Sequence, residues 1–409
     1  MIFRCLLWVA LPIILSGVEP VRADDATPTN PKVELLVQQL GDEKFALREQ
    51  AARQLIETGM EAIDLLRQGL ESDDAHVQLQ VEYLIDAILQ KDKRDRITAF
   101  LAGDDQAIPF WPEYCQIANS SPSARKNYAR MAEKEWNLLS YIGRHPDQID
   151  EAIRQRSSEL IAQCKNREMR TVPSTMNVAM LLFVCDSSSQ VSSETYKEVV
   201  QQLTPLAIRD SVKSPVERQL FDNWVAQSVK RPELGHDLRL QILFTAMRVN
   251  LRSGTILAKE YIAECETMPE IGLGKLPIAL GMLAIAKLGS RSELPYLESR
   301  FNDSSSADQS VGGFANVPAS KGEKPLQRQV RDFALLAAIH LEGQDPYEFG
   351  LTRLVPNPIS LYLHSTVGFT SEEERIAAFE KWRLYRESAA QRELSPVFSD
   401  PETSRHDTQ

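Results

Sequence analysis

Few side chains of this sequence stand at the spacings that catalytic or metal-binding motifs require. There is no His-Glu-x-x-His pair, no Cys-x-x-Cys pair and no Gly-x-Ser-x-Gly turn. Gly272 and Gly274 precede Lys275 at the start of an expected helix, where backbone amides could face an anion. The third glycine of a dinucleotide-binding loop and the hydroxyl residue that follows the lysine of a P-loop are both missing. We therefore interpret this segment as an ordinary helix-initiating turn.

One histidine lies close to carboxylates, His145 with Asp147 and Asp150. Carboxylates in the first turn of a helix cap backbone N–H groups and interact well with the helix dipole, so their presence requires no metal ion. His340 falls partly on the apolar stripe of another expected helix, as a core or boundary histidine does. The sequence thus predicts no catalytic residues, no metal ligands and no cofactor.

An aromatic group, Phe110, Trp111 and Tyr114, could form a binding platform. Pro112 interrupts it, and aromatic side chains this dense more often anchor an irregular loop to the core. We favour that structural interpretation.

The helices that must position any such groups show a repeat. Residues 47–55 are echoed by residues 77–85, 30 positions later. A period of this size is typical of helical-repeat proteins, whose units bury their apolar faces by stacking on neighbours. The expected buried stripes are Leu47, Ala51 and Leu55, then Ile63, Leu66 and Leu70, then Val77, Val81, Leu84 and Ile85.

These residues resemble HEAT-type repeats, the two-helix units of α-solenoids. The HEAT motif tends to place an Asp in the turn within each repeat and an Arg or Lys in the second helix. Asp42 and Arg48 match the first copy. In the second copy Asp73 or Asp74 matches the acidic position, whereas Gln78 stands at the basic one.

A second stretch of this kind is expected near the C-terminus. Its buried stripes are Leu294, Leu297 and Phe301 on one helix, and Val330, Phe333 and Ala337 on its partner. Residues 330–341 and 379–383 resemble the C-terminal parts of secreted bacterial HEAT-like proteins. The predicted fold is all-α, an α-solenoid of stacked helical hairpins that is irregular in its middle.

The first 23 residues read as a secretory signal. Arg4 gives a positive start, residues 5–17 are apolar, and Val21-Arg22-Ala23 predicts cleavage after Ala23. The apolar run is shorter than the roughly 20 residues that a membrane span needs. We expect a secreted or periplasmic protein with no membrane span after cleavage.

The expected organisation beyond the signal follows from composition and periodicity. A flexible lead-in covers 24–31, N-terminal HEAT-like repeats 32–95, and an irregular helical region 96–270, with one helix expected at 123–139. A C-terminal HEAT-like repeat covers 271–345 with a polar insert at 302–325, followed by a helical segment at 346–387 and a disordered tail at 388–409.

Four cysteines follow the signal: Cys115, Cys164, Cys185 and Cys265. Four thiols allow three disulfide connectivities in an exported protein. In an antiparallel hairpin, Cys164 and Cys185 would lie more than ~10 Å apart, which disfavours a bond between them. Free thiols are the favoured interpretation, and the disulfide state stays open.

The net charge is −11, which argues against nucleic acid as the main partner because phosphate binding needs a basic surface. The leading hypothesis is an exported, non-enzymatic scaffold that binds a protein or peptide, because the HEAT resemblance implies scaffold or adaptor roles. The alternative is an extracytoplasmic enzyme, for example a hydrolase of envelope polymers, with its site in 96–270. A purely structural envelope component is a third possibility, and the oligomeric state stays open.

A Leu84→Asp substitution tests the repeat register. This position is expected on the buried stripe of the fourth helix, so the change would bury an unpaired charge. We expect the free energy of unfolding to fall by several kcal/mol, measured by thermal unfolding. A variant that unfolds at the wild-type temperature would show that the register is wrong.

Overall fold

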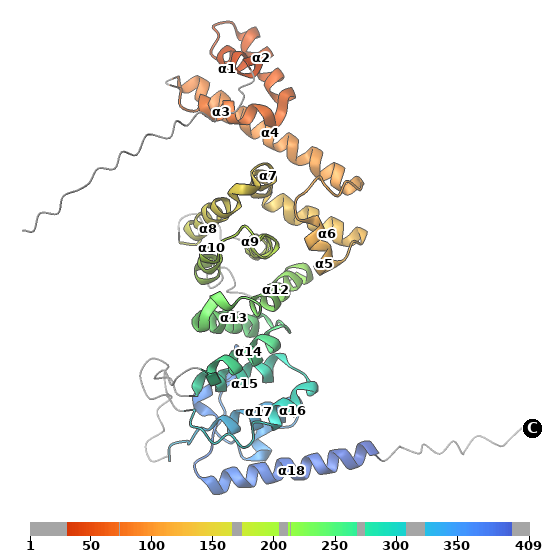
Figure 1. The fold of residues 1–409 in the computed structure, drawn as a ribbon, viewed down its shortest axis with the longest axis vertical. Helices are drawn as coiled ribbons and strands as arrows, with labels where there is room; N and C mark the ends of the chain where they lie inside the picture. The colour runs from red at the N-terminus through yellow and green to blue at the C-terminus, as the bar shows by residue number, and fades with distance from the viewer. Residues whose placement is uncertain are drawn as a thin grey trace, which may run out of the picture. The chain divides into compact units, whose positions relative to one another are not determined.

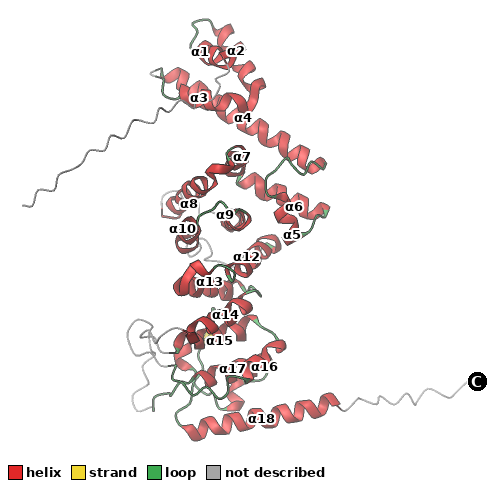
Figure 2. Cartoon of the chain, viewed as in Figure 1, coloured by secondary structure: helices red, strands yellow, loops and turns green. Residues whose placement is uncertain are grey.

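The computed structural model describes residues 31–72, 74–165, 174–203, 212, 214–267, 275–307 and 324–394, and is almost entirely helical (Figure 2). Within these ranges the only strands are the antiparallel pair β1 (Pro356–Asn357) and β2 (Leu361–Tyr362). The predicted all-α class is therefore confirmed. None of the described helices is long and apolar enough to cross a membrane.

Several expectations fall outside the described residues. They are the signal peptide with its cleavage site at Ala23, the lead-in up to residue 30, Asp73, the Cys164 side chain, Gly272 and Gly274, the central part of the polar insert at 308–323, and the chain from 395 onward. The start of the insert pairs with the segment that follows it, because the Ala307 N–H donates to the Arg328 carbonyl at 2.9 Å.

The chain forms two compact units, Met1–Asp95 and Arg96–Gln409. The described elements of the first unit are α1 (Pro31–Gln39), α2 (Phe45–Thr58), the 3-10 turn η1 (Gly59–Ala62), α3 (Ile63–Gly69) and the first part of α4 (Ala75–Ala102) (Figure 1). This last helix continues to Ala102, past the expected end of the N-terminal repeats at residue 95. The charged run after Lys91 consists of good helix formers, and Gly103 then ends the helix with a positive φ of 117°.

The loops of the first unit carry the same side-chain clamp twice. Arg48 Nη1 donates to the carbonyls of Asp42 at 2.8 Å and Glu43 at 3.1 Å. Thirty positions later, Gln78 Nε2 donates to the carbonyl of Ser72 at 2.7 Å. The Gln78 amide therefore binds a loop carbonyl as the Arg48 guanidinium does, although the HEAT pattern favours a cation at position 78.

Two residues of the second copy, Ser72 and Asp74, accept turn hydrogen bonds like that of Asp42. In the first copy Asp42 Oδ1 accepts from the Lys44 N–H at 2.8 Å, which shapes the turn. In the second copy Ser72 Oγ accepts from the Asp74 N–H at 3.3 Å in the same way. Asp74 Oδ1 also accepts from the His76 N–H at 2.8 Å, so the expected acidic residue makes the same turn bond as Asp42, while Ser72 stands 30 positions after Asp42.

The core of the first unit follows the 30-residue shift. Val33 and Ile63, Leu36 and Leu66, and Ala51 and Val81 are buried as equivalent pairs. Of the marked positions, Ala51, Leu55, Ile63, Leu66, Val81 and Leu84 are buried, whereas Leu47, Leu70, Val77 and Ile85 are half-buried.

The second unit contains the remaining helices (Figure 1). They are α5 (Trp111–Ala118), α6 (Pro122–Lys134), α7 (Trp136–Arg144), α8 (Ile149–Lys165), α9 (Thr175–Ser187), α10 (Ser193–Glu198), α12 (Pro215–Ser228), α13 (Gly235–Val249), α14 (Gly254–Thr267), α15 (Leu276–Leu288), α16 (Leu294–Glu298), α17 (Val330–Leu341) and α18 (Glu372–Leu394). Short turns connect them: η2 (Pro146–Gln148), the π-helical η3 (Val199–Leu203), η4 (Pro232–Leu234), η5 (Arg291–Glu293), η6 (Pro346–Phe349) and η7 (His364–Thr366).

The helix expected at 123–139 is broken at Glu135. This residue has non-helical angles, φ −116° and ψ 31°, and separates α6 from α7. Its buried carboxylate accepts from Arg156 Nε at 2.8 Å and Nη2 at 3.0 Å, and also from the Asn177 side chain. The break lets one carboxylate bind side chains of both α8 and α9, a long-range requirement that local periodicity does not contain.

Most helices between α12 and α17 contact a neighbour in the sequence, and several also contact the helix after it. α14 lies between α13 and α15, while α12 contacts α14, α13 contacts α15 and α15 contacts α17. Gly281 of α15 lets α14 come close, since a Cβ there would lie 2.6 Å from Ile262 Cγ1. In the expected C-terminal repeat, Leu294, Leu297, Val330, Phe333 and Ala337 are buried and Phe301 is half-buried.

The last described helix is tied to α17 by a fully buried ion pair. Arg375 Nε donates to Asp332 Oδ1 at 2.7 Å and Nη2 donates to Oδ2 at 3.2 Å, and both side chains are 0% exposed. At the other end of α17, Tyr385 and Arg386 bind the Glu342 carboxylate at 3.1 and 3.0 Å. Because the Asp332–Arg375 and Glu342–Tyr385 pairs have the same 43-residue separation, α17 and α18 run in the same direction.

The last described helix, α18, continues past the expected start of the C-terminal tail. α18 runs to Leu394, past the boundary at Ser388, where we had placed the start of a disordered segment. Residues 388–394 lack a continuous apolar face, but they contain strong helix formers that extend an already nucleated helix.

An Arg375→Met substitution should cost about 3–5 kcal/mol of unfolding free energy, because it leaves the Asp332 carboxylate buried without its partner. Replacing both residues, Asp332→Leu with Arg375→Met, should recover much of the loss. The measurement is chemical denaturation, with Arg383→Met on the exposed face of α18 as the control. Equal midpoints for Arg375→Met and Arg383→Met would contradict the assigned role.

Candidate functional site

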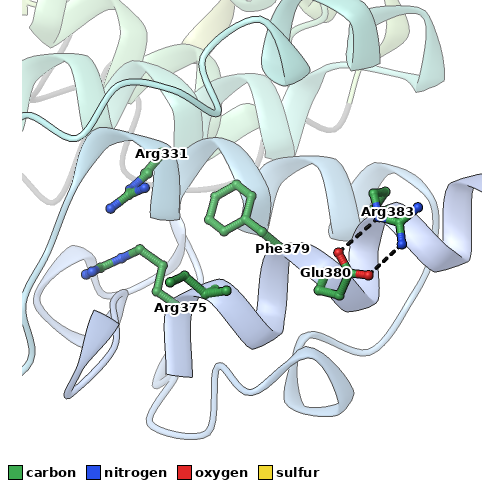
Figure 3. A pocket seen from close by; sticks show the side chains of 6 residues that line it. Arg331, Arg375, Phe379, Glu380 and Arg383 are labelled. Carbon is green, nitrogen blue, oxygen red and sulfur yellow. Dashed lines mark hydrogen bonds and ion pairs between the residues drawn. The ribbon is translucent and has the colours of Figure 1, made fainter. Parts of the chain in front are cut away.

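Two hollows flank the first half of α18. The smaller one, about 270 Å³, is lined by Arg331, Arg375, Ile376, Phe379, Glu380 and Arg383 (Figure 3). Its cations are already paired, because Arg331 binds Glu372 at 2.7 Å, Arg375 binds Asp332, and Arg383 binds Glu380. This hollow therefore offers an apolar contact around Phe379 but little uncompensated charge.

The larger hollow, which we call the basic groove, has a volume of about 590 Å³. Leu326, Phe349, Phe369, Ala377 and Ala378 form its apolar floor. Its rim consists of Lys324, Gly350, Thr352, Arg353, Gly368, Thr370, Glu374 and Lys381. A groove with an apolar floor and a few polar groups at its edge is the usual form of a binding site.

Backbone geometry holds the floor of the basic groove in place. Phe369 pairs with Gln327 through two backbone hydrogen bonds of 2.8 and 3.3 Å. Gly368 has a φ of 145°, and a Cβ there would lie 2.6 Å from the Gln327 carbonyl oxygen, so only glycine fits. Arg375 Nη2 also donates to the Gln327 carbonyl, at 3.0 Å. The arginine of the buried ion pair is therefore hydrogen-bonded to Gln327, the residue that pairs with Phe369 of the groove floor.

The rim of the basic groove carries an excess of positive charge. Its single carboxylate, Glu374, accepts from the side chain and N–H of Thr370, and these bonds hold the pKa of Glu374 below its usual value. Arg353 donates to the Lys324 carbonyl at 2.7 Å, and Lys381 donates to the Glu348 carbonyl at 2.9 Å. Neither Lys324 nor Lys381 forms an ion pair with another residue of the described ranges.

The first unit presents a different surface. Leu79 and Tyr83 lie one turn apart on α4 and are 66% and 69% exposed. Phe45 at the start of α2 is also 66% exposed, although the Arg48 guanidinium lies 5.6 Å from its ring centre. Large apolar side chains that are neighbours on a solvated helix are typical of a contact surface.

A buried polar cluster lies where α9 ends. Arg231 reaches Asp186 at 3.4 Å and lies 3.9 Å from the centre of the Tyr196 ring. Asp186 Oδ2 and the Tyr196 hydroxyl are buried near each other, but neither forms a hydrogen bond of good geometry. Burial raises the pKa of Asp186 to about 7, and the nearby Arg231 only partly opposes this.

A second cluster brings a cysteine close to a histidine. Tyr261 Oη lies 2.8 Å from His236 Nε2, and Cys265 Sγ lies 3.7 Å from Nδ1. Burial and the neighbouring Glu264 raise the pKa of Cys265 to about 11, so its thiol stays protonated at neutral pH. A protonated thiol is a poor nucleophile, and this geometry favours a structural hydrogen bond.

The residues singled out in the sequence have separate structural roles. Asp150 Oδ1 accepts from the Ser192 N–H at 2.8 Å, while the His145 ring lies 4.9 Å from that of Tyr141. Trp111 and Tyr114 are buried in an aromatic cluster, as an anchor would be. His340 is half-buried, and burial lowers its pKa.

The remaining sequence expectations concern thiols, metals and a cleft. Cys115, Cys185 and Cys265 are free thiols, and no group of three metal-ligating side chains occurs among the residues described. One hollow lies in the region where a catalytic cleft was considered, and it contains neither the Asp186 cluster nor the His236 cluster. Its lining residues are Pro215, Arg218, Gln219, Asp222, Asn250, Leu251 and Arg252.

The sequence does not predict the basic groove, because Lys324, Arg353 and Lys381 belong to separate segments with no common motif. No family model, no curated protein and no solved structure matches this chain.

The raised pKa of Asp186 predicts a pH dependence of stability. A carboxyl whose pKa rises from 3.8 to about 7 on folding stabilises the protein fully below pH 3.8, and this contribution is lost as the pH rises to 7. Relative to Asp186→Asn, the wild type should lose at least about 1 kcal/mol between pH 4.5 and 7. Urea denaturation of both proteins across this range measures the difference. A constant difference would contradict the raised pKa.

Proposed function

We propose that this chain is an exported, non-enzymatic interaction protein whose helices stack as a HEAT-like α-solenoid and bind another protein or peptide. The proposal places it outside the cytoplasm, as the first 23 residues predict, and gives nucleic acid no role because the net charge is −11.

The solenoid arrangement is supported by regularities within each unit. The clamp of Arg48 on the Asp42 carbonyl recurs as Gln78 on the Ser72 carbonyl, 30 positions later. In the second unit, contacts between a helix and the next but one recur along α12 to α17. Proteins in which each repeat contacts only its neighbours form extended arrays with long exposed helix faces.

The observation that carries the binding role is the exposed pair Leu79 and Tyr83 on α4. Both side chains leave about two thirds of their surface in water, and their spacing of four residues places them on one face of the helix. Tyrosine is enriched among the residues that dominate binding energy at protein interfaces. We infer that this face contacts the partner.

Affinity capture from envelope extract tests the proposal. We expect proteins retained by the wild type to be reduced at least about tenfold with a Leu79→Ser/Tyr83→Ser variant, because a tyrosine at the centre of an interface contributes about 2 kcal/mol or more. Ile256→Ser removes a similarly exposed apolar side chain, 56% exposed on α14, and is the matched control.

The Leu79→Ser/Tyr83→Ser and Ile256→Ser variants should both melt at the wild-type temperature, since exposed positions contribute little to stability. Equal capture by the wild type and the Leu79→Ser/Tyr83→Ser variant would contradict the proposed surface. A hydrolytic activity on envelope polymers that copurifies with the chain, with no retained partner, would favour the enzyme alternative.

A further inference from the structure

We propose that the basic groove binds an acidic peptide segment of a partner protein, with an apolar side chain on the floor and carboxylates at the rim. This inference rests on the proposed interaction function and names the chemistry of one partner segment. It concerns a surface of the second unit, and is tested independently of Leu79 and Tyr83 on α4.

The floor selects for an apolar side chain. Phe349, Phe369 and Ala378 are at most 6% exposed, so the accessible apolar surface of the groove comes mainly from Leu326, which is half-buried, and Ala377, which is exposed. The volume of about 590 Å³ lies within the range of ~300–1,000 Å³ that is usual for ligand sites. An aromatic or branched aliphatic side chain would displace water from this apolar surface, which is the favourable term in such binding.

The rim selects for negative charge. Lys324 and Lys381 line the groove with one carboxylate, Glu374, whose oxygen already accepts two hydrogen bonds from Thr370. Lys324 also interacts electrostatically with Glu373, which lies outside the groove lining. A lysine ammonium has three N–H donors, and Lys381 uses one of them on the Glu348 carbonyl. Donors therefore remain for the carboxylates of an incoming segment, and ion pairs at this solvated rim would weaken with salt.

The chain's own C-terminal residues have suitable chemistry but are too close to the end of α18. Phe398 and Asp400 lie four and six positions beyond Leu394. From Ala378 on the groove floor to Leu394, the helix spans about 24 Å, whereas four extended residues reach at most ~14 Å. Phe398 therefore cannot reach the floor of its own groove, and the occupant that we propose is a segment of another protein.

The test uses a fluorescein-labelled peptide, Gly-Asp-Glu-Phe-Asp-Leu-Gly-Ser, and fluorescence anisotropy with the full chain. We expect saturable binding that weakens at least tenfold between 50 and 300 mM NaCl. A Lys324→Gln/Lys381→Gln variant should bind at least tenfold more weakly than the wild type. The matched control, Lys126→Gln/Arg392→Gln, removes two exposed cations outside the groove and should bind as the wild type does.

Three results would overturn the inference. They are no binding of the acidic peptide, equal binding of a version with Ser in place of every Asp and Glu, and equal binding by the wild type and the Lys324→Gln/Lys381→Gln variant. Displacement of the peptide by oleate at lower concentration than by unlabelled peptide would assign the groove to a fatty acid instead.

Failure of the groove and failure of the proposed function give different results. If a captured partner depends on Leu79 and Tyr83 while the acidic peptide does not bind, the groove inference is wrong and the proposed function stands. If the peptide binds as expected and displaces a captured partner, both are supported.

Discussion

The second unit depends, in its C-terminal part, on one buried guanidinium. Arg375 binds both oxygens of Asp332 and also the Gln327 carbonyl, so a single side chain joins α18, the start of α17 and the segment that pairs with Phe369. A buried ion pair carries a desolvation cost of several kcal/mol per ion, and is tolerated when the remaining hydrogen-bonding groups are satisfied. Asp332 meets this condition because its second oxygen also accepts from the Gln329 N–H at 2.9 Å.

Other buried carboxylates differ in how well an arginine pairs with them. Glu135 is buried at a helix break and is bound by Arg156 through two hydrogen bonds, in the same forked manner as Asp332. Asp186 has a single, longer contact with Arg231, and its second oxygen forms no hydrogen bond of good geometry. Burial raises the pKa of both Asp332 and Asp186, but only Asp332 has two short bonds from an arginine to oppose that effect. A similar burial therefore produces a structural ion pair in one place and a titrating carboxyl in the other.

The sequence predicts the helices of this chain better than their ends or their surfaces. Apolar spacing alone identifies the buried stripes through Ala51 and Val81 and through Val330 and Phe333, because burial follows the helical period directly. It does not predict the break at Glu135, which depends on Arg156 21 residues away. Apolar spacing also does not predict that Ser72, 30 positions after Asp42, accepts the equivalent turn hydrogen bond, because a search for acidic residues passes over serine. The basic groove could not be predicted, because its cations come from three separate segments that only the folded chain brings together.

The outer face of α18 is less suited to binding an apolar side chain than the basic groove beside it. Ile376 and Leu384 are 61% and 52% exposed, but Arg383 between them pairs with Glu380 and Glu387. Because these charges keep that face hydrated, its two apolar side chains do not form a continuous patch. On the groove side Leu326 and Ala377 line the same hollow as Lys324 and Lys381. Water on such an apolar surface forms few favourable interactions with the protein. A peptide can place an apolar side chain on the floor and pair its carboxylates with the lysines of the rim.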